Sequence, residues 1–243
     1  MSASTADRPA AGPRPTAADF YATNRGGGLF SEAVSQRLGA HLALAAERLG
    51  LPPTALTLAN LMVGLPVSVI VIALAGPVAA GTVPAWAVGL LALIGWQLAY
   101  GLDCADGQLA RVTGRSSPTG ARLDILCDVA AQVALVTALS ATGAAQRPET
   151  PIWLWAAFAG TWMVNLVTSV LQSGPQAVSM VPSRSPAVRL VKLIRDYGAV
   201  ITLAGLVLTV APAWTVWLVV AFTVVNGGFL LVSIAFSART SLR

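Results

Sequence analysis

The sequence predicts an all-α, polytopic membrane protein in which six transmembrane helices follow an amphipathic helix on the membrane surface. Of the 243 residues, 56% are hydrophobic and only 10% are charged, and the mean hydropathy is +0.72. A typical soluble domain has about 25% charged residues, so this composition excludes an ordinary soluble fold. The apolar residues also form runs of about 20, the length of helix that crosses a bilayer.

The N-terminal region is expected to lie outside the bilayer. Residues 1–28 are rich in Ala, Pro, Gly and Thr and have no positively charged start followed by a short apolar core. We therefore expect a disordered cytoplasmic tail and no signal peptide. In residues 29–50, apolar side chains recur at helical spacing at Leu38, Leu42, Ala45 and Leu49. This pattern predicts an amphipathic juxtamembrane helix on the membrane surface.

The transmembrane domain is expected to cover residues 51–238, with a short cytoplasmic C-terminal end at 239–243. Pro66 lies inside the first span and is expected to kink it. The fifth span is short, and we expect it to continue backwards into a polar helix. Hydropathy places the six spans at 54–75, 84–103, 123–144, 151–172, 197–211 and 213–236.

The positions of the cations predict the orientation. With a cytoplasmic N-terminus, Arg147 is the only one of the 15 lysines and arginines that falls in an outer loop. Such an asymmetry indicates which side of a membrane is cytoplasmic. We therefore expect a multi-pass protein of the cytoplasmic membrane. The net charge of +5 is explained by contact with anionic lipid headgroups and requires no nucleic acid.

Four aspartates lie at the ends of the second and third spans, where carboxylates are costly and call for a reason. Asp103 and Asp106 are three residues apart and Asp124 and Asp128 are four apart, so each pair shares one face of a helix. Two such helices bring four like charges together, and hard divalent cations are the usual partner of such a group. The residues thus predict a site for Mg²⁺ or Mn²⁺ that faces the cytoplasm.

The same segment matches a known family. From Asp103 to Asp128 it reads Asp-x2-Asp-Gly-x2-Ala-Arg-x8-Gly-x3-Asp-x3-Asp, and every fixed position of this pattern is present over 26 residues. The pattern resembles the signature of the CDP-alcohol phosphotransferases, which are integral membrane enzymes of phospholipid synthesis. The family's fold also has six spans, with the motif joining the second and third.

The resemblance implies a reaction and its residues. A phospho-alcohol group, most simply phosphatidyl, is transferred from a CDP-alcohol to an acceptor alcohol, and CMP is released with the help of two Mg²⁺ or Mn²⁺ ions. Asp103, Asp106 and Asp124 are implied as metal ligands, while Asp128 both contacts a metal and removes the acceptor's proton. A homodimer is also implied. The expected nucleotide and pyrophosphate contacts are Asp103, Gly107, Ala110, Arg111, Gly120, Thr57 and Asn60.

The acceptor site is predicted in the fourth loop. If the helix of the fifth span extends backwards, three cations of this loop share one face, where they bind either an acceptor phosphate or anionic lipid. The basic residues of the loop are Arg184, Arg189, Lys192 and Arg195. Two positions depart from the family pattern: the first span starts Pro53-Thr54-Ala55-Leu56-Thr57 without the usual asparagine, and Val129 stands where a cation often follows the motif.

The sequence leaves several alternatives open. CDP-diacylglycerol with a small polar acceptor is preferred as the commonest bacterial arrangement. The alternative is a small donor, such as CDP-inositol, CDP-ethanolamine or CDP-choline, with a lipid or inositol-type acceptor. Membrane prenyltransferases also use aspartates and magnesium, but on two separate motifs. A divalent-cation transporter is expected to have acids near the middle of the bilayer on several helices, whereas here they cluster at one membrane face.

Overall fold

The computed structural model describes residues 14–24, 28–171 and 196–241, and within these ranges the regular structure is entirely helical. Four helices are long and apolar enough to cross a membrane: α3 (Pro53–Ala79), α4 (Ala85–Val112), α5 (Pro118–Gln146) and the segment Pro212–Ala235, which includes most of α9 (Thr215–Ser241). These helices confirm the predicted all-α fold and support the prediction of a membrane protein.

Two shorter apolar helices lie at the positions of the other expected spans. They are α6 (Ile152–Leu171) and α8 (Tyr197–Val210). The count of six spans therefore stays a prediction. The polar helix expected to precede α8 falls outside the described residues.

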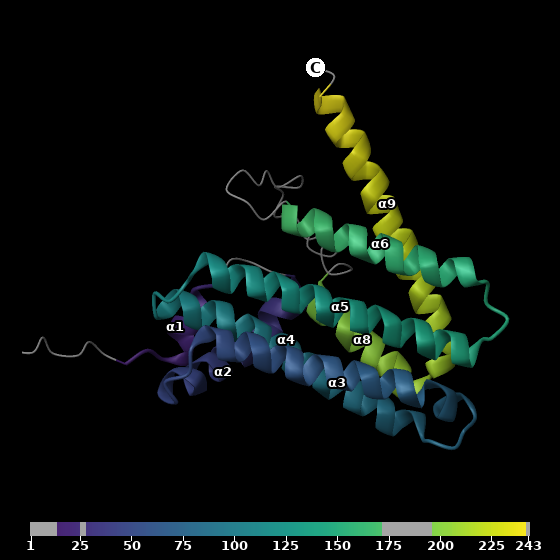
Figure 1. Ribbon diagram of the computed structural model, residues 1–243, viewed down its shortest axis with the longest axis horizontal. Coiled ribbons are helices and arrows are strands. Elements are labelled where there is room, and N and C mark those ends of the chain that lie inside the picture. Colours follow the sequence, from purple (N-terminus) through teal and green to yellow (C-terminus); the bar gives the residue numbers. More distant parts are fainter. Residues whose placement is uncertain (1–13, 25–27, 172–195, 242–243) are drawn as a thin grey trace, which may run out of the picture.

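The long helices α3, α4 and α5 run side by side, and α8 packs against α4 (Figure 1). Helices α6 and α9 pack together beside α5, and the C-terminal end of α9 projects away from the bundle (Figure 1). Proline occupies the first position of α3 and of α5, where its missing N–H costs nothing. Pro66 lies inside α3, which continues through it as a helix.

Small residues allow α4 and α8 to approach closely. A Cβ atom on Gly89 of α4 would lie 2.3 Å from the Thr209 Cα atom of α8, and one on Gly205 of α8 would lie 2.7 Å from the Leu93 Cα atom. Such small-residue contacts let the backbones of membrane helices pack against each other. Next to this crossing, buried Trp96 donates a hydrogen bond to Ser68 Oγ (3.0 Å) and thereby joins α4 to α3.

The N-terminal region forms α1 (Ala17–Ala22), a π-helical turn η1 (Ser31–Ser35) and α2 (Gln36–Arg48), which packs on α4. The face of α2 buried against the protein consists of Gln36, Gly39, Ala40, Ala43 and Ala46. Of the leucines expected on the apolar face, Leu49 is 74% exposed, while Leu38 lies against Gly101 of α4. Small side chains let α2 lie close to α4, while its place on the membrane surface stays a prediction.

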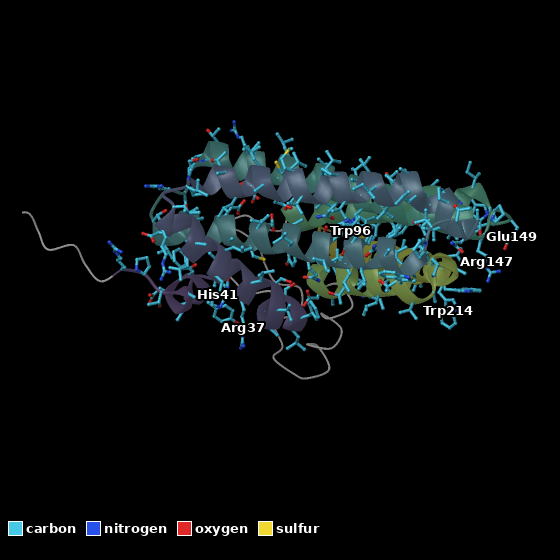
Figure 2. The ribbon with its side chains drawn as sticks, turned by 90° about the horizontal axis from the view of Figure 1, so that it is seen from below. Arg37, His41, Trp96, Arg147, Glu149 and Trp214 are labelled. Atoms are coloured by element: carbon cyan, nitrogen blue, oxygen red, sulfur yellow. The ribbon has the colours of Figure 1, made fainter. Side chains whose placement is uncertain are left out.

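The two ends of the bundle carry different side chains. Arg37 and His41 lie toward one end, and Arg147, Glu149 and Trp214 lie at the other (Figure 2). Arg147 pairs with Glu149 across 3.7 Å. Exposed tryptophans occur near the loops of this second end, as expected at a membrane–water interface. They are Trp86, Trp153, Trp214 and Trp217, each more than 60% exposed.

Candidate active site

Three aspartates meet where the second half of α4 faces the first half of α5. Asp103 and Asp106 come from α4 and Asp124 comes from α5, and one carboxylate oxygen of each lies within 4.8 Å of the others. The one-turn spacing on α4 points both of its carboxylates at α5. The structure therefore brings together three of the four aspartates expected from the sequence.

The fourth aspartate lies at the inner side of this group. Asp128 of α5 lies near Asp103 of α4. These two carboxylates line a small cavity of about 20 Å³ that also contacts Asn60, Tyr100 and Tyr197. A cavity of this size has room for one group as large as a water molecule.

Two buried polar side chains of α3 hold the aspartates of α4 in place. The Thr57 hydroxyl donates a short hydrogen bond to Asp106 Oδ2, and Asn60 Nδ2 donates to Asp103 Oδ1 at 3.4 Å. Both α3 residues are 4% exposed. A fixed donor on one carboxylate oxygen orients the other oxygen, as the outer partners of metal ligands do.

The residues fit a divalent cation. Asp124 Oδ1 is buried and has no hydrogen-bond partner among the described residues. A buried anionic oxygen without a donor is costly, and three carboxylates at this separation repel one another unless a cation lies between them. The ligands are all oxygen atoms, which suits Mg²⁺ or Mn²⁺ better than a metal that prefers His or Cys.

A larger pocket of about 270 Å³ adjoins the aspartates. Two helices begin at it, since Pro53 and Thr54 of α3 and Ser117 at the N-cap of α5 belong to its wall. The amino ends of helices favour anions through their free N–H groups and their dipoles. Arg111 and Arg115 add two positive charges from the end of α4 and the loop after it. The pocket is therefore suited to a ligand with several negative charges.

Gly107 provides space for Arg111. A Cβ atom on Gly107 would lie 2.9 Å from Arg111 Nη1 and 3.2 Å from Nη2, so the guanidinium folds back over the glycine one turn earlier on α4. This position brings the charge of Arg111 near Asp124. Gly107 also lines the larger pocket, so its expected contact with a nucleotide stays a prediction.

Gly120 lies in the first turn of α5. Its N–H donates to Ser117 Oγ at 3.0 Å, which caps the helix. A Cβ atom on Gly120 would lie 3.1 Å from the same oxygen. The cap and the glycine together keep the start of α5 open toward the larger pocket.

Comparison with known proteins identifies the family. The model of the CDP-alcohol phosphatidyltransferases matches residues 51–225, which cover most of the chain. The chain belongs to this family. Membership means that a phospho-alcohol group is transferred from a CDP-alcohol, and it favours a transferase over the alternative of a cation transporter. No curated protein matches the chain.

The expected nucleotide contacts divide between the two cavities. Thr57, Gly107, Ala110, Arg111 and Gly120 line the larger pocket, whereas Asn60 and Asp103 line the smaller cavity. The candidate acceptor residues Arg184, Arg189, Lys192 and Arg195 lie outside the described residues.

Sequence reasoning missed some residues of the larger pocket. Arg115, Ser116 and Ser117 line it and had no assigned role. For Ser117 a signal was available, because serine directly before a proline is typical of a helix start.

Proposed function

We propose that the protein transfers a phosphatidyl group from CDP-diacylglycerol to a small polar alcohol and releases CMP, in phospholipid biosynthesis. The observation that supports this proposal most strongly is the contact between the three-aspartate group and the larger pocket, since Asp106 and Asp124 belong to both. A diphosphate in this pocket has Arg111 and two helix amino ends on one side and the carboxylate group on the other. We propose that the catalytic domain covers residues 51–238 and acts as a homodimer.

An apolar surface next to the site supports a lipid substrate. On α5 the residues around Asp124 and Asp128 expose Ile125 (39%), Leu126 (66%) and Val133 (46%). In a membrane this face contacts acyl chains, so a diacylglycerol donor can reach the carboxylates with its tails in lipid. The exposed tryptophans at the far end of the bundle and the excess of cations near the site support an active site that faces the cytoplasm.

The residues of the chain have separable roles in the proposed reaction. Asp103, Asp106, Asp124 and Asp128 would hold the two divalent ions, Mg²⁺ or Mn²⁺, with the first three forming the close group. When bound, such ions neutralise phosphate charge and stabilise the leaving group. Thr57 and Asn60 orient two of the carboxylates. Arg111 lies on the pocket side and binds a phosphate oxygen of the donor.

Asp128 is proposed as the base. The hydroxyl oxygen of the acceptor forms a bond to the phosphorus that carries the alcohol, and the bond from that phosphorus to the oxygen of CMP breaks. The hydroxyl proton passes to an Asp128 oxygen and from there to solvent, while CMP leaves with the electron pair. Asp128 is suited to this step because it lines the small cavity together with Asp103, next to the group of three aspartates.

The test is release of CMP by the purified protein with Mg²⁺ or Mn²⁺, CDP-diacylglycerol and a panel of polar alcohols. CDP-ethanolamine, CDP-choline and CDP-inositol are supplied in parallel with diacylglycerol or inositol phosphate. Acceptor-dependent release from CDP-diacylglycerol, lost in Asp128→Asn, is the expected result. Release only from a small CDP-alcohol contradicts the proposed donor and supports the alternative. No release from any donor contradicts the proposed reaction.

The basic loop is proposed to bind a phosphate on the acceptor. Arg189→Ala and Arg195→Ala are expected to raise the acceptor KM and leave the donor KM unchanged, because only the acceptor loses a charged partner. An unchanged acceptor KM in both variants refutes this assignment and leaves anionic lipid as the partner of the loop.

A further inference from the structure

A buried carboxylate joins two helix starts that are far apart in the sequence. Asp196 is 4% exposed and forms the N-cap of α8, where Oδ1 accepts hydrogen bonds from the N–H groups of Gly198 (3.1 Å) and Ala199 (3.4 Å). Its Oδ2 accepts from the N–H groups of Phe30 (2.8 Å) and Ser31 (2.9 Å) at the start of η1. Ser31 Oγ makes a further short hydrogen bond to Oδ1. Five donors thus bond to the two oxygens of one carboxylate.

This arrangement sets the direction of the next hydrogen bond. A carboxylate only accepts, so the single proton of the Ser31 hydroxyl goes to Asp196. Tyr100 Oη lies 3.1 Å from Ser31 Oγ, and with the Ser31 proton already used the phenol is the donor of this bond. The lone pairs of Tyr100 Oη are then left as acceptors. The thiol of Cys104 also lies near this phenol, but a thiol is a weak hydrogen-bond partner.

Tyr100 lies at the reacting centre. It is one turn before Asp103 on α4 and lines the small cavity with Asp103 and Asp128. Tyr197, which directly follows Asp196, lines the same cavity. The two tyrosine rings meet edge to face, with centroids 4.9 Å apart and planes at 82°. Asp196 is therefore connected to both tyrosines of the cavity, to Tyr100 through Ser31 and to Tyr197 through the start of α8.

The close fit around Asp196 requires glycine at two positions. A Cβ atom on Gly198 would lie 2.8 Å from Ser35 Oγ and 2.9 Å from Ser31 Oγ. A Cβ atom on Gly28 would lie 2.0 Å from Asp196 Oδ2. Neither glycine has a positive φ angle, so close approach is the reason for both. The sequence thus specifies this contact from both sides.

We propose that Asp196 is a positioning residue, which acts through Ser31 to hold the phenol oxygen of Tyr100 as a hydrogen-bond acceptor beside Asp103 and Asp128. The inference rests on the proposed function and deepens it. In the proposed reaction, Tyr100 Oη accepts a hydrogen bond from a hydroxyl group of the acceptor alcohol and keeps that alcohol next to Asp128. In the proposed reaction the diphosphate of the donor lies in the larger pocket, which Tyr100 does not line, so we expect the chain Asp196–Ser31–Tyr100 to affect the acceptor KM and not the donor KM.

The experiment measures donor and acceptor KM and kcat for CMP release in four single variants of the full-length protein, and in two double variants that add Ser31→Ala or Asp196→Asn to Tyr100→Phe. Tyr100→Phe removes the phenol oxygen, Ser31→Ala removes the proton acceptor of the phenol, and Asp196→Asn removes the charge. Ser35→Ala is the matched control, because Ser35 is buried on the same turn and its hydroxyl bonds to Gln97 at 3.2 Å instead of to Tyr100. Thermal unfolding of each variant is followed in parallel.

Tyr100→Phe is expected to raise the acceptor KM up to about tenfold, which corresponds to one hydrogen bond, and to leave the donor KM unchanged. Ser31→Ala and Asp196→Asn are expected to act in the same direction. In the Tyr100→Phe background neither change raises the acceptor KM further, because the phenol oxygen through which both would act is already absent. Ser35→Ala leaves the acceptor KM at the wild-type value.

Three results overturn the inference. One is a wild-type acceptor KM in both Tyr100→Phe and Ser31→Ala while the wild-type enzyme is active. The second is additive effects on the acceptor KM in the double variants. The third is an equal rise in the donor and acceptor KM, which indicates a general loss of structure. These results can be obtained from Tyr100→Phe, Ser31→Ala and their double variant, so the test does not require that Asp196→Asn folds. A wild-type protein that releases no CMP overturns the proposed function as well, so the two failures are distinguishable.

Discussion

Replacing Gly107 with alanine tests whether the position of Arg111 matters for the reaction. The new Cβ atom would lie 2.9 Å from Arg111 Nη1, whereas ordinary contact begins at 3.4 Å, so this nitrogen must move by about 0.5 Å. A misplacement of about 1 Å at a reacting centre can cost about 100-fold in rate, so half that distance predicts a loss of roughly tenfold in kcat/KM.

Stability is expected to change in the opposite direction. Alanine inside a helix is more favourable than glycine by about 0.5–1 kcal/mol, and the atoms that the new methyl group meets belong to the far end of a flexible side chain. Gly107→Ala should therefore unfold at the wild-type temperature or slightly above it. Gly76→Ala in α3 is the matched control, because a Cβ atom there meets nothing within 4 Å.

The assay is CMP release at varied donor concentration, together with thermal unfolding of the same preparations. A kcat/KM within twofold of wild type in Gly107→Ala refutes the idea that the guanidinium must lie over this glycine. A lower unfolding temperature that accompanies lost activity also refutes it, since Gly107 is then needed for packing. In Gly76→Ala both the activity and the fold should be retained.

Three further changes test other parts of the molecule. Thr57→Val keeps the side-chain shape but removes the donor to Asp106, and should weaken activation by Mn²⁺ by roughly tenfold or more; an unchanged Mn²⁺ titration contradicts this role. Gly89→Ala places a methyl group 2.3 Å from the Thr209 Cα atom, and should destabilise the α4–α8 contact by about 1–3 kcal/mol; thermal unfolding at or above the wild-type temperature shows that the helices separate without cost. Treatment with EDTA should abolish CMP release and lower the unfolding temperature, and added Mg²⁺ or Mn²⁺ should restore both, because the cation screens three converging carboxylates. Activity that survives EDTA speaks against a metal-dependent reaction.

The sequence predicted the helices well because their signal is local. The expected spans at 84–103 and 123–144 correspond to α4 (Ala85–Val112) and α5 (Pro118–Gln146). The start of α4 and the end of α5 agree closely with the expectation, whereas the ends near the aspartates differ. Hydropathy reflects contact with lipid. The apolar run of the second span ends at Asp103, although the helix continues as far as Val112. The motif was placed correctly, but partly on a helix that projects beyond the expected span.

The buried face of α2 was not predictable in the same way. A leucine stripe marks an apolar face in an isolated helix, but the contact with α4 uses Gly39, Ala40 and Ala43, whose small size matters more than their hydropathy. The Cβ atom that Gly39 lacks would lie 2.8 Å from Cys104 Cβ. Only the position of the neighbouring helix reveals this requirement.

The candidate site shows the same limit for residues that act from a distance. Asp103, Asp106 and Asp124 are recognisable because spacing along one helix determines which side chains share a face. No spacing rule connects Asp196 with Ser31, which precedes it by 165 residues, and in the sequence Asp196 is one acidic residue that follows a run of cations. Four of its five donors are backbone N–H groups, which every residue type except proline has, so these partner positions carry little information about the contact. The glycines at positions 28 and 198 do carry information, because only a residue without a Cβ atom leaves room for the carboxylate and the two serine hydroxyls. The aspartates proposed to perform the chemistry are therefore recognisable from local spacing, whereas a positioning residue such as Asp196 is recognisable only from contacts between distant parts of the chain.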